Sequence, residues 1–297
     1  DSYPCICKRW FRNIPCRLQN VATSPDMPST YNILLLGSTE SASLEICRSL
    51  GRLGHHFMIL RLSEQKIAAY YSRFCTENLY LGSPEGLGVG GYLSKLRDLL
   101  SARRFDYLMP IDSLACELVY FDYEAISSLV KVVGPNPSAY ATVHNRFKAL
   151  ALAASAGLAK PETILIKQED SLPITYFPCL IKPVFLLAII EDEPQYFSER
   201  KVKSSYALDA KSRDDLPRCD IMLQEPVDGE TVELNICAVD GKLLGITVAV
   251  RLHESNKFGS SYRKSGEVTL KIQAIAEAIA HKLCWTGFMA IECKRKG

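Results

Sequence analysis

Hydrophobic positions in the first part of the chain alternate between short apolar runs and helical spacing. Four apolar runs predict β-strands, at residues 32–36, 57–60, 107–111 and 131–133. Helical spacing follows the first run up to Gly54 and recurs over residues 93–100. Strands that alternate with helices in this way indicate a parallel α/β sheet.

A different pattern begins at Asn136. Asn136-Pro137-Ser138 opens a helical stretch that Gly157 ends. Six apolar or alternating runs predict further strands, at residues 162–166, 179–182, 221–224, 232–239, 243–250 and 288–293. A helix with one apolar face, from Val268 to Leu283, precedes the last of these strands. Strands joined by hairpin turns, with few helices, indicate an α+β arrangement.

These patterns divide the chain into three parts. Residues 1–30 show no periodicity and hold four prolines, so we interpret them as an N-terminal extension. Residues 31–135 form the predicted parallel α/β domain, and residues 136–297 form a second, α+β domain. A chain of 297 residues that is 47% apolar can bury the cores of two such domains.

Charge and cysteine content narrow the class of protein. The net charge of +2, from 35 basic and 33 acidic residues, is too balanced for a reader of phosphate backbones, so we expect no nucleic-acid partner. The 11 cysteines form no CxxC pair, which favours reduced cysteines that act as small core residues, as at Cys47, Cys179, Cys237 and Cys293. No apolar run approaches the ~20 residues that span a bilayer, and no signal-peptide pattern occurs. We therefore expect a cytoplasmic protein without membrane association.

Residues 223–245 carry the pattern most typical of a ligand site. Their apolar run ends in Gln224-Glu225-Pro226-Val227, a polar hinge whose backbone can hydrogen-bond the edge of a planar base. Beyond the hinge, Glu233 alternates with apolar residues on a strand, and its carboxylate can reach a sugar. Asp240-Gly241 then predicts a two-residue hairpin turn.

Lys182 and Glu292 are charged residues on strands that are otherwise apolar. Lys182 ends its strand and can neutralise nucleotide phosphates; the alternative is a lysine that reaches solvent. Glu292 needs a partner, either a divalent cation that bridges phosphates or an ion pair with Lys294 or Arg295. Both residues are therefore candidates for a nucleotide site.

Three arginines are further candidates. Arg146 begins a helical stretch just after the expected domain boundary, and Arg251 and Arg263 flank a Gly/Ser-rich loop at residues 259–261. Each of them can bind a phosphate or an acidic substrate, and each can equally be an ordinary solvated arginine.

The turn after the first strand, Gly37-Ser38-Thr39, allows a different interpretation. A dinucleotide-binding fold would place a phosphate there, but the GxGxxG spacing is absent. We interpret it as an ordinary strand–helix turn capped by Ser or Thr. No Walker-type P-loop and no GxSxG motif occurs in the chain.

From residue 31 onward, a series of motifs occurs in a fixed order: Leu108-Met109-Pro110-Ile111-Asp112, Asn145-Arg146-Phe147, residues 157–163, Lys182-Pro183, Gln224-Glu225-Pro226-Val227 and residues 285–294. The order of these motifs resembles the ATP-grasp superfamily, in its branch related to the large chain of carbamoyl phosphate synthetase. The resemblance implies a pre-ATP-grasp α/β domain, followed by an ATP-grasp domain with an antiparallel nucleotide-binding lobe.

The same resemblance implies an ATP-dependent ligase that activates a carboxylate substrate as an acyl phosphate for attack by an amine or similar nucleophile. Its implied cofactors are ATP and Mg²⁺. The roles that it implies are Arg146 and Lys182 on phosphates, Gln224 to Val227 on adenine, Glu233 (or Glu230 in its place) on ribose, and Glu292 on magnesium. Arg251 or Arg263 would steady the transferring phosphoryl group. Related enzymes often dimerise, so a homodimer is an open expectation.

Two departures from the family pattern leave competing hypotheses open. Residues 184–190 hold no glycine where the family has a glycine-rich loop over the phosphates. The family pattern also continues past Gly297, with a strand that carries further magnesium ligands. The chain is therefore either a fragment of a catalytic ligase or a degenerate homologue that binds a nucleotide or partner without turnover. A Rossmann oxidoreductase is a third hypothesis, which only the first strand–helix turn supports.

Overall fold

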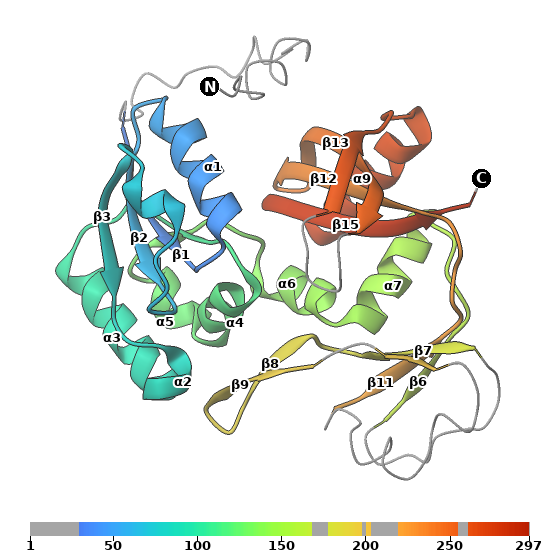
Figure 1. Cartoon of the computed structure of the whole chain (residues 1–297), viewed down its shortest axis with the longest axis horizontal. Helices are drawn as coiled ribbons and strands as arrows, with labels where there is room; N and C mark the ends of the chain where they lie inside the picture. Colours follow the sequence, from blue (N-terminus) through green and yellow to red (C-terminus); the bar gives the residue numbers. More distant parts are fainter. Residues whose placement is uncertain (1–29, 168–177, 198–199, 203–218, 255–260, 297) are drawn as a thin grey trace.

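The computed structural model describes residues 30–167, 178–197, 200–202, 219–254 and 261–296 (Figure 1). Apart from Thr30, the expected N-terminal extension lies outside these residues, as do Gly259 and Ser260 of the predicted Gly/Ser-rich loop. In the part of the chain that is described, no helix is long and apolar enough to cross a membrane.

The N-terminal unit (residues 32–132) is built on a five-stranded sheet in the order β3-β2-β1-β4-β5, with every neighbouring pair parallel. Its strands are β1 (Asn32–Leu36), β2 (His56–Arg61), β3 (Cys75–Tyr80), β4 (Tyr107–Pro110) and β5 (Lys131–Val132). Its helices are α1 (Glu40–Gly51), the 3₁₀ helix η2 (Ala68–Tyr71), α2 (Pro84–Leu87), α3 (Val89–Ala102), α4 (Ser113–Phe121) and α5 (Tyr123–Ser127). The parallel α/β sheet predicted for this part of the chain is confirmed.

Side chains of β1 pack on both faces of this sheet. Leu34 and Leu36 belong to a hydrophobic cluster with α3, α4 and α5, whereas Ile33 and Leu35 belong to a second cluster with Cys47 of α1 and with η2. Because successive side chains of a strand point to opposite faces, a strand covered on both sides is apolar throughout. This is why β1 and β2 are visible in the sequence as apolar runs. The edge strand β3 was not predicted, because none of its residues is fully buried and Glu77 and Asn78 interrupt it.

Two helices, α6 (Pro137–His144) and α7 (Arg146–Ser155), follow the N-terminal unit. The helical stretch predicted from Asn136 to Gly157 is divided at Asn145, where the backbone leaves the helical region (φ −78°, ψ 104°), and the helix start expected at Arg146 is confirmed. The Asn145 side chain accepts a hydrogen bond from the Lys148 N–H at 3.0 Å and so caps α7. The expected domain boundary at residue 135 falls between β5 and α6 and stays a prediction.

Two antiparallel sheets complete the fold. The small sheet has the order β10-β7-β11-β6 and consists of β6 (Thr163–Ile166), β7 (Cys179–Pro183), β10 (Arg200–Val202) and β11 (Ile221–Gln224). The large sheet has the order β14-β13-β12-β15 and consists of β12 (Glu230–Val239), β13 (Lys242–Glu254), β14 (Ser261–Ser265) and β15 (Gly287–Arg295). Helix α9 (Leu270–Leu283) packs on β12 and β13. The predicted hairpin turn at Asp240-Gly241 is confirmed, since both residues have positive φ (47° and 77°).

A further hairpin, which the sequence did not predict, joins β7 to β10. Its strands are β8 (Leu187–Ile190) and β9 (Glu193–Tyr196), and they pair with each other and with no strand of the larger sheets. Figure 1 shows this β8–β9 hairpin reaching from the small sheet towards α2 and α4 of the N-terminal unit, and both helices contact it. The apolar, glycine-free segment after Lys182 thus ends in strand β8.

Candidate functional site

Lys182 and Gln224 lie on one face of the small sheet. Ile181 and Leu223 point into a hydrophobic cluster on the opposite face, and Lys182 and Gln224 each follow one of these residues along a strand. Across the β7–β11 pair, Lys182 is opposite Met222 and Gln224 is opposite Leu180. The structure therefore brings the candidate phosphate lysine and the start of the candidate adenine hinge to the same side of one sheet.

The hinge Gln224-Glu225-Pro226-Val227 follows β11 directly. Gln224 is buried, and its Nε2 donates a hydrogen bond to Thr163 Oγ1 at 3.1 Å, so its side chain is fixed by β6. The Glu225 N–H donates to the Glu162 carbonyl oxygen at 3.0 Å, and Pro226 has no N–H to offer. Val227 is then the first hinge position whose backbone N–H can serve a base.

Arg146 lies next to the end of β7 that carries Lys182. Its backbone N–H donates to the Val184 carbonyl oxygen at 2.9 Å, and its Nη1 donates to the Pro183 carbonyl oxygen at 3.3 Å. These contacts join the first turn of α7 to the residues that follow Lys182. Arg146 thus binds the two residues that directly follow Lys182, the other cation predicted to bind phosphates.

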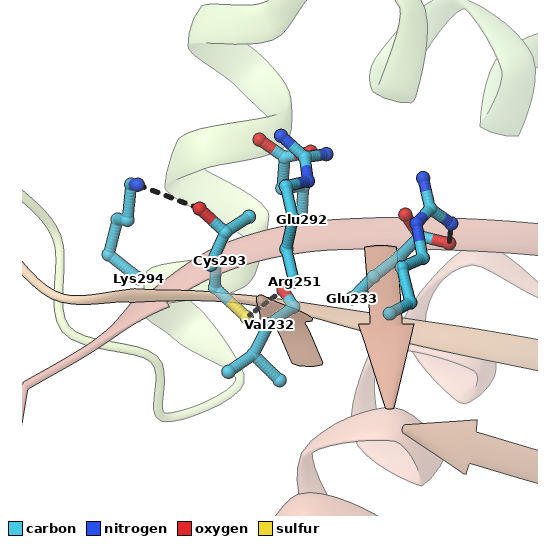
Figure 2. Close-up of polar contacts among 8 residues, drawn as sticks. Val232, Glu233, Arg251, Glu292, Cys293 and Lys294 are labelled. Atoms are coloured by element: carbon cyan, nitrogen blue, oxygen red, sulfur yellow. Dashed lines mark hydrogen bonds and ion pairs between the residues drawn. The ribbon is translucent and has the colours of Figure 1, made fainter. Parts of the chain in front are cut away.

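The other predicted residues lie on the face of the large sheet that points away from α9. Val232, Leu234, Val248 and Val250 pack with Ile272 of α9, so the side chains that alternate with them point to the opposite face. Glu233 on β12, Arg251 on β13, Arg263 on β14 and Glu292 on β15 all have this orientation. Figure 2 shows Glu292 and Lys294 on one side of the sheet and the Val232 side chain on the other.

The carboxylates on this face are paired with arginines. Glu233 and Glu292 are direct neighbours across β12 and β15, an arrangement that is unfavourable unless cations compensate the two like charges. Arg251 reaches across β12 to Glu292 (Nη2–Oε2 2.5 Å), and Arg263 reaches across β13 to Glu233 (Nη1–Oε1 2.8 Å). The Glu233 side chain is mostly buried (17% exposed), whereas that of Glu292 is 55% exposed.

The expected alternative partners of Glu292 were wrong. Lys294 Nζ donates to Thr231 Oγ1 at 2.7 Å, and the Arg295 guanidinium binds Glu230. Both contacts follow the strand register, which places Thr231 opposite Lys294 and Glu230 opposite Arg295. Directly opposite residues are closer than neighbours along one strand, so each cation binds across the ladder. The hydrogen bond from Arg295 lowers the pKa of Glu230, which keeps that carboxyl ionised.

These carboxylates do not make a magnesium site by themselves. Mg²⁺ prefers near-octahedral oxygen coordination, whereas the described residues hold no group of three or more His, Cys, Asp or Glu side chains placed for a metal ion. Glu233 and Glu292 both bind arginines instead. The assignment of Glu292 to magnesium therefore stays a prediction.

The turn after β1 differs from its prediction in one detail. Thr39 occupies the N-cap of α1, but its side chain makes no capping hydrogen bond, so the expected Ser or Thr cap is wrong. Asp112 supports the turn instead, because its Oδ2 accepts from the Ser38 N–H at 2.7 Å and its Oδ1 accepts from the Ala115 N–H at 2.9 Å. An aspartate that ends a strand and begins a helix is the sequence signal for this role.

Sequence reasoning also missed a set of side chains that joins the N-terminal unit to the start of the β8–β9 hairpin. The rings of Tyr120, Tyr140, His144 and Phe185 follow one another at centroid distances of 3.8, 5.3 and 5.0 Å. Glu117 of α4 accepts a hydrogen bond from the Tyr140 hydroxyl and lies 2.8 Å from His144 Nε2. Aromatic residues at scattered positions carry no periodic signal, so only the folded chain shows that they meet.

Comparison with known proteins identifies the fold. No family model and no curated protein sequence matches the chain. An N5-carboxyaminoimidazole ribonucleotide synthetase in complex with ADP matches with a TM-score of 0.65 at 14% identity, over 90% of this chain and 67% of that chain. An L-amino acid ligase from Bacillus licheniformis matches with a TM-score of 0.67 at 14% identity, over 90% of this chain and 64% of that chain.

A D-alanine–D-alanine ligase from Bacillus anthracis complexed with ATP also matches, with a TM-score of 0.56 at 14% identity over 90% of this chain and 82% of that chain. The chain thus spans about two thirds of the length of the first two enzymes. Likeness at this level of identity establishes the fold. The chain has the fold of these synthetases and ligases, and the fold class that the resemblance implied is confirmed.

Proposed function

We propose that this protein is an ATP-dependent ligase that activates a carboxylate substrate as an acyl phosphate for attack by an amine or a similar nucleophile. The observation that carries the proposal is that Arg146 binds the carbonyl oxygens of Pro183 and Val184, directly after Lys182 at the end of β7. The other end of the same sheet leads into the hinge. Matched structures that hold ADP and ATP support the use of an adenine nucleotide.

Each predicted residue except Glu292 has a role in this proposal. Lys182 and Arg146 neutralise the phosphates, Gln224 to Val227 hold the adenine edge, and Glu233 binds the ribose hydroxyls. A substrate carboxylate oxygen attacks the γ-phosphorus and ADP leaves; the amine then attacks the acyl carbon and inorganic phosphate leaves. Arg251 or Arg263 steadies the phosphoryl group during its transfer. Positioning and charge neutralisation supply most of the catalysis in such a reaction.

A second function remains in competition, a protein that binds a nucleotide without turnover. The observation that favours it is the pairing of Glu233 and Glu292 with Arg263 and Arg251, because each ion pair occupies groups that the ligase would use on its ligands. Nucleotide binding without phosphate release, across a panel of acid and amine pairs, would favour this second function.

The nucleotide site is tested first by thermal unfolding with ATP, ADP and NADH, each with and without Mg²⁺. A ligand at a hundredfold excess over its Kd stabilises the folded protein by about 2.7 kcal/mol, which corresponds to a rise of several degrees in Tm. We expect this rise with ATP and ADP and none with NADH. A rise with NADH alone would instead favour the oxidoreductase hypothesis.

Lys182→Ala should then weaken ATP binding about 10- to 100-fold, the effect of losing one charge-assisted hydrogen bond, and leave Tm without ligand nearly unchanged. Lys271→Ala is the matched control, because Lys271 is an exposed lysine on α9, on the far face of the large sheet. Equal ATP affinity of the Lys182→Ala variant and the wild type would contradict the assignment of Lys182 to the phosphates.

A further inference from the structure

The β8–β9 hairpin occupies the connection in which the resembling family has a glycine-rich loop. It leaves the small sheet just after Lys182-Pro183 and returns to that sheet through β10. Its two-residue turn, Glu191-Asp192, has positive φ at both positions (51° and 66°), the geometry of a tight hairpin. The segment next to the candidate phosphate lysine is therefore a two-stranded hairpin.

The tip of this hairpin is attached to the N-terminal unit. The Asp192 carbonyl oxygen accepts from the Val89 N–H at 2.9 Å, and Asp192 Oδ1 accepts from the Gly90 N–H at 2.7 Å. Both donors belong to the first turn of α3, whose N–H groups have no partner within the helix. A Cβ on Gly88 would lie 2.4 Å from Asp192 Oδ2, so the close approach depends on glycine at that position.

The strands of the hairpin add apolar contacts along the same path. Leu187 is only 2% exposed, and Ile189 packs against the hydrophobic cluster of the N-terminal unit. At its base, Phe185 contacts the His144 ring, and the Val184 carbonyl oxygen accepts from Arg146. One continuous segment, residues 184–196, thus extends from the two candidate phosphate cations to α3.

We propose that the β8–β9 hairpin is a latch that controls access to the face of the small sheet on which Lys182 lies. With Asp192 on α3, the hairpin holds this part of the small sheet close to the N-terminal unit; when Asp192 detaches, the hairpin moves away as one piece. The hydrogen bond between Asp192 Oδ1 and the Gly90 N–H is exposed, and bonds of this kind contribute little net free energy, so release of the tip is reversible. The role in nucleotide access rests on the proposed function, whereas the release itself does not.

Two glycine substitutions in the same turn separate the latch from general effects on the hairpin. Asp192→Gly removes the carboxylate, and Glu191→Gly leaves it in place; both put glycine where φ is positive, so their backbone effects are alike. Asp192→Asn keeps one side-chain oxygen and tolerates positive φ, so it should restore most of the attachment. Loss of one capping carboxylate corresponds to about a fivefold change in the attachment equilibrium.

Hydrogen exchange of the full chain without nucleotide tests the release. We expect the Val89 and Gly90 amides, which the tip of the hairpin binds, to exchange about fivefold faster in Asp192→Gly, with the β8–β9 ladder and β1 unchanged and Glu191→Gly like the wild type. Faster exchange in the hairpin alone, or no change, would overturn the latch. This result does not depend on whether the protein binds a nucleotide.

Binding kinetics of ATP on the immobilised full chain then test the control of access. A latch that only limits access should let the association and dissociation rates both rise about fivefold in Asp192→Gly, with Kd nearly unchanged. Faster hydrogen exchange in Asp192→Gly, with unchanged rates of ATP association and dissociation, would overturn the control of access. If neither wild type nor variants bind ATP, the proposed function fails, and the exchange experiment alone decides whether the hairpin is a latch.

Discussion

Glu233 and Glu292 show how two like charges are tolerated side by side on a strand pair. Each carboxylate binds an arginine that reaches across an intervening strand, at 2.8 Å for Arg263 and 2.5 Å for Arg251. Removal of the paired arginine should destabilise the protein more at Glu233 than at Glu292. Glu233 is the more buried of the two, and a desolvated carboxylate needs a partner. A ribose hydroxyl that binds Glu233 must therefore share it with Arg263.

The ribose assignment predicts a result in a double-mutant cycle. The wild type should bind ATP about tenfold more tightly than the 2′- or 3′-deoxynucleotide whose missing hydroxyl Glu233 binds, since one charge-assisted hydrogen bond is lost. Glu233→Gln should lose most of this preference, because the variant and the deoxynucleotide remove the same contact. Isothermal titration of both nucleotides against both proteins gives the coupling between them.

Glu230→Gln is the control for this cycle, because Glu230 is the other carboxylate that could bind ribose. Its side chain is 52% exposed and pairs with Arg295 rather than with Arg263. It should keep the preference of the wild type for ATP. Loss of the preference in Glu230→Gln alone would transfer the role to that residue, and loss in neither variant would remove the ribose assignment from both.

At the scale of elements, the turn between β12 and β13 is attached as well as tight. The Gly241 N–H donates to the Trp285 carbonyl oxygen at 3.0 Å, and the Asp240 N–H donates to Thr286 Oγ1 at 2.9 Å. A Cβ on Gly241 would lie 3.2 Å from the Ala280 carbonyl oxygen of α9, in addition to the strain of φ +77°. The turn thereby fixes the end of α9 and the start of β15 relative to the strands of the candidate site.

Gly241→Ala should therefore destabilise the protein by about 1–3 kcal/mol, through positive φ and crowding together. Gly245→Ala, four residues further along β13, is the matched control, because nothing lies within 4 Å of its added Cβ. That variant should be neutral or more stable by up to about 1 kcal/mol, since alanine is favoured over glycine inside a strand. Urea unfolding compares the two, and equal destabilisation would contradict this account of the turn.

The elements that could be predicted from sequence are those whose residue types match their surroundings in the fold: apolar runs in buried strands, and turn residues where φ is positive. The apolar runs of β1 and β2 and the Asp240-Gly241 turn are of this kind. The hairpin β8–β9 could not be predicted, because its turn, Glu191-Asp192, holds no glycine despite its positive φ, and its stability comes partly from contacts with distant helices. The start of a helix at Arg146 was predicted, but the Asn145 side-chain cap that separates it from α6 was not.

The candidate site was predictable only in part for the same reason. Alternation along β12 is enough to place Glu233 on the face opposite to Val232. The pairing of Arg251 with Glu292 depends on the register of three strands, which no local pattern specifies. The proximity of Arg146 to the end of β7 likewise depends on how α7 meets a strand more than 30 residues away in the sequence.

At the scale of the whole molecule, the N-terminal unit and the sheets are held together through α6. Tyr140 is at the centre of this contact: its ring stacks on Tyr120 of α4 at 3.8 Å, and its hydroxyl donates to Glu117. Burial and the neighbouring Glu117 raise the pKa of Tyr140, so the hydroxyl stays protonated and continues to donate. His144, on the same helix, continues the stack to Phe185 at the base of the β8–β9 hairpin.

This contact should make the described parts of the chain unfold together. In calorimetry, we expect one transition for the wild type, with equal van't Hoff and calorimetric enthalpies. Tyr140→Ala removes both the stack and the hydrogen bond to Glu117, so the two parts should unfold separately and the calorimetric enthalpy should exceed the van't Hoff enthalpy. Tyr123→Ala is the control, because Tyr123 stacks on Tyr120 within the N-terminal unit; it should lower Tm and keep one transition. A single transition in Tyr140→Ala would contradict this role of Tyr140. It would mean that other contacts, such as the docked β8–β9 hairpin, suffice to couple the two parts. The double variant Tyr140→Ala with Asp192→Gly should then show two transitions.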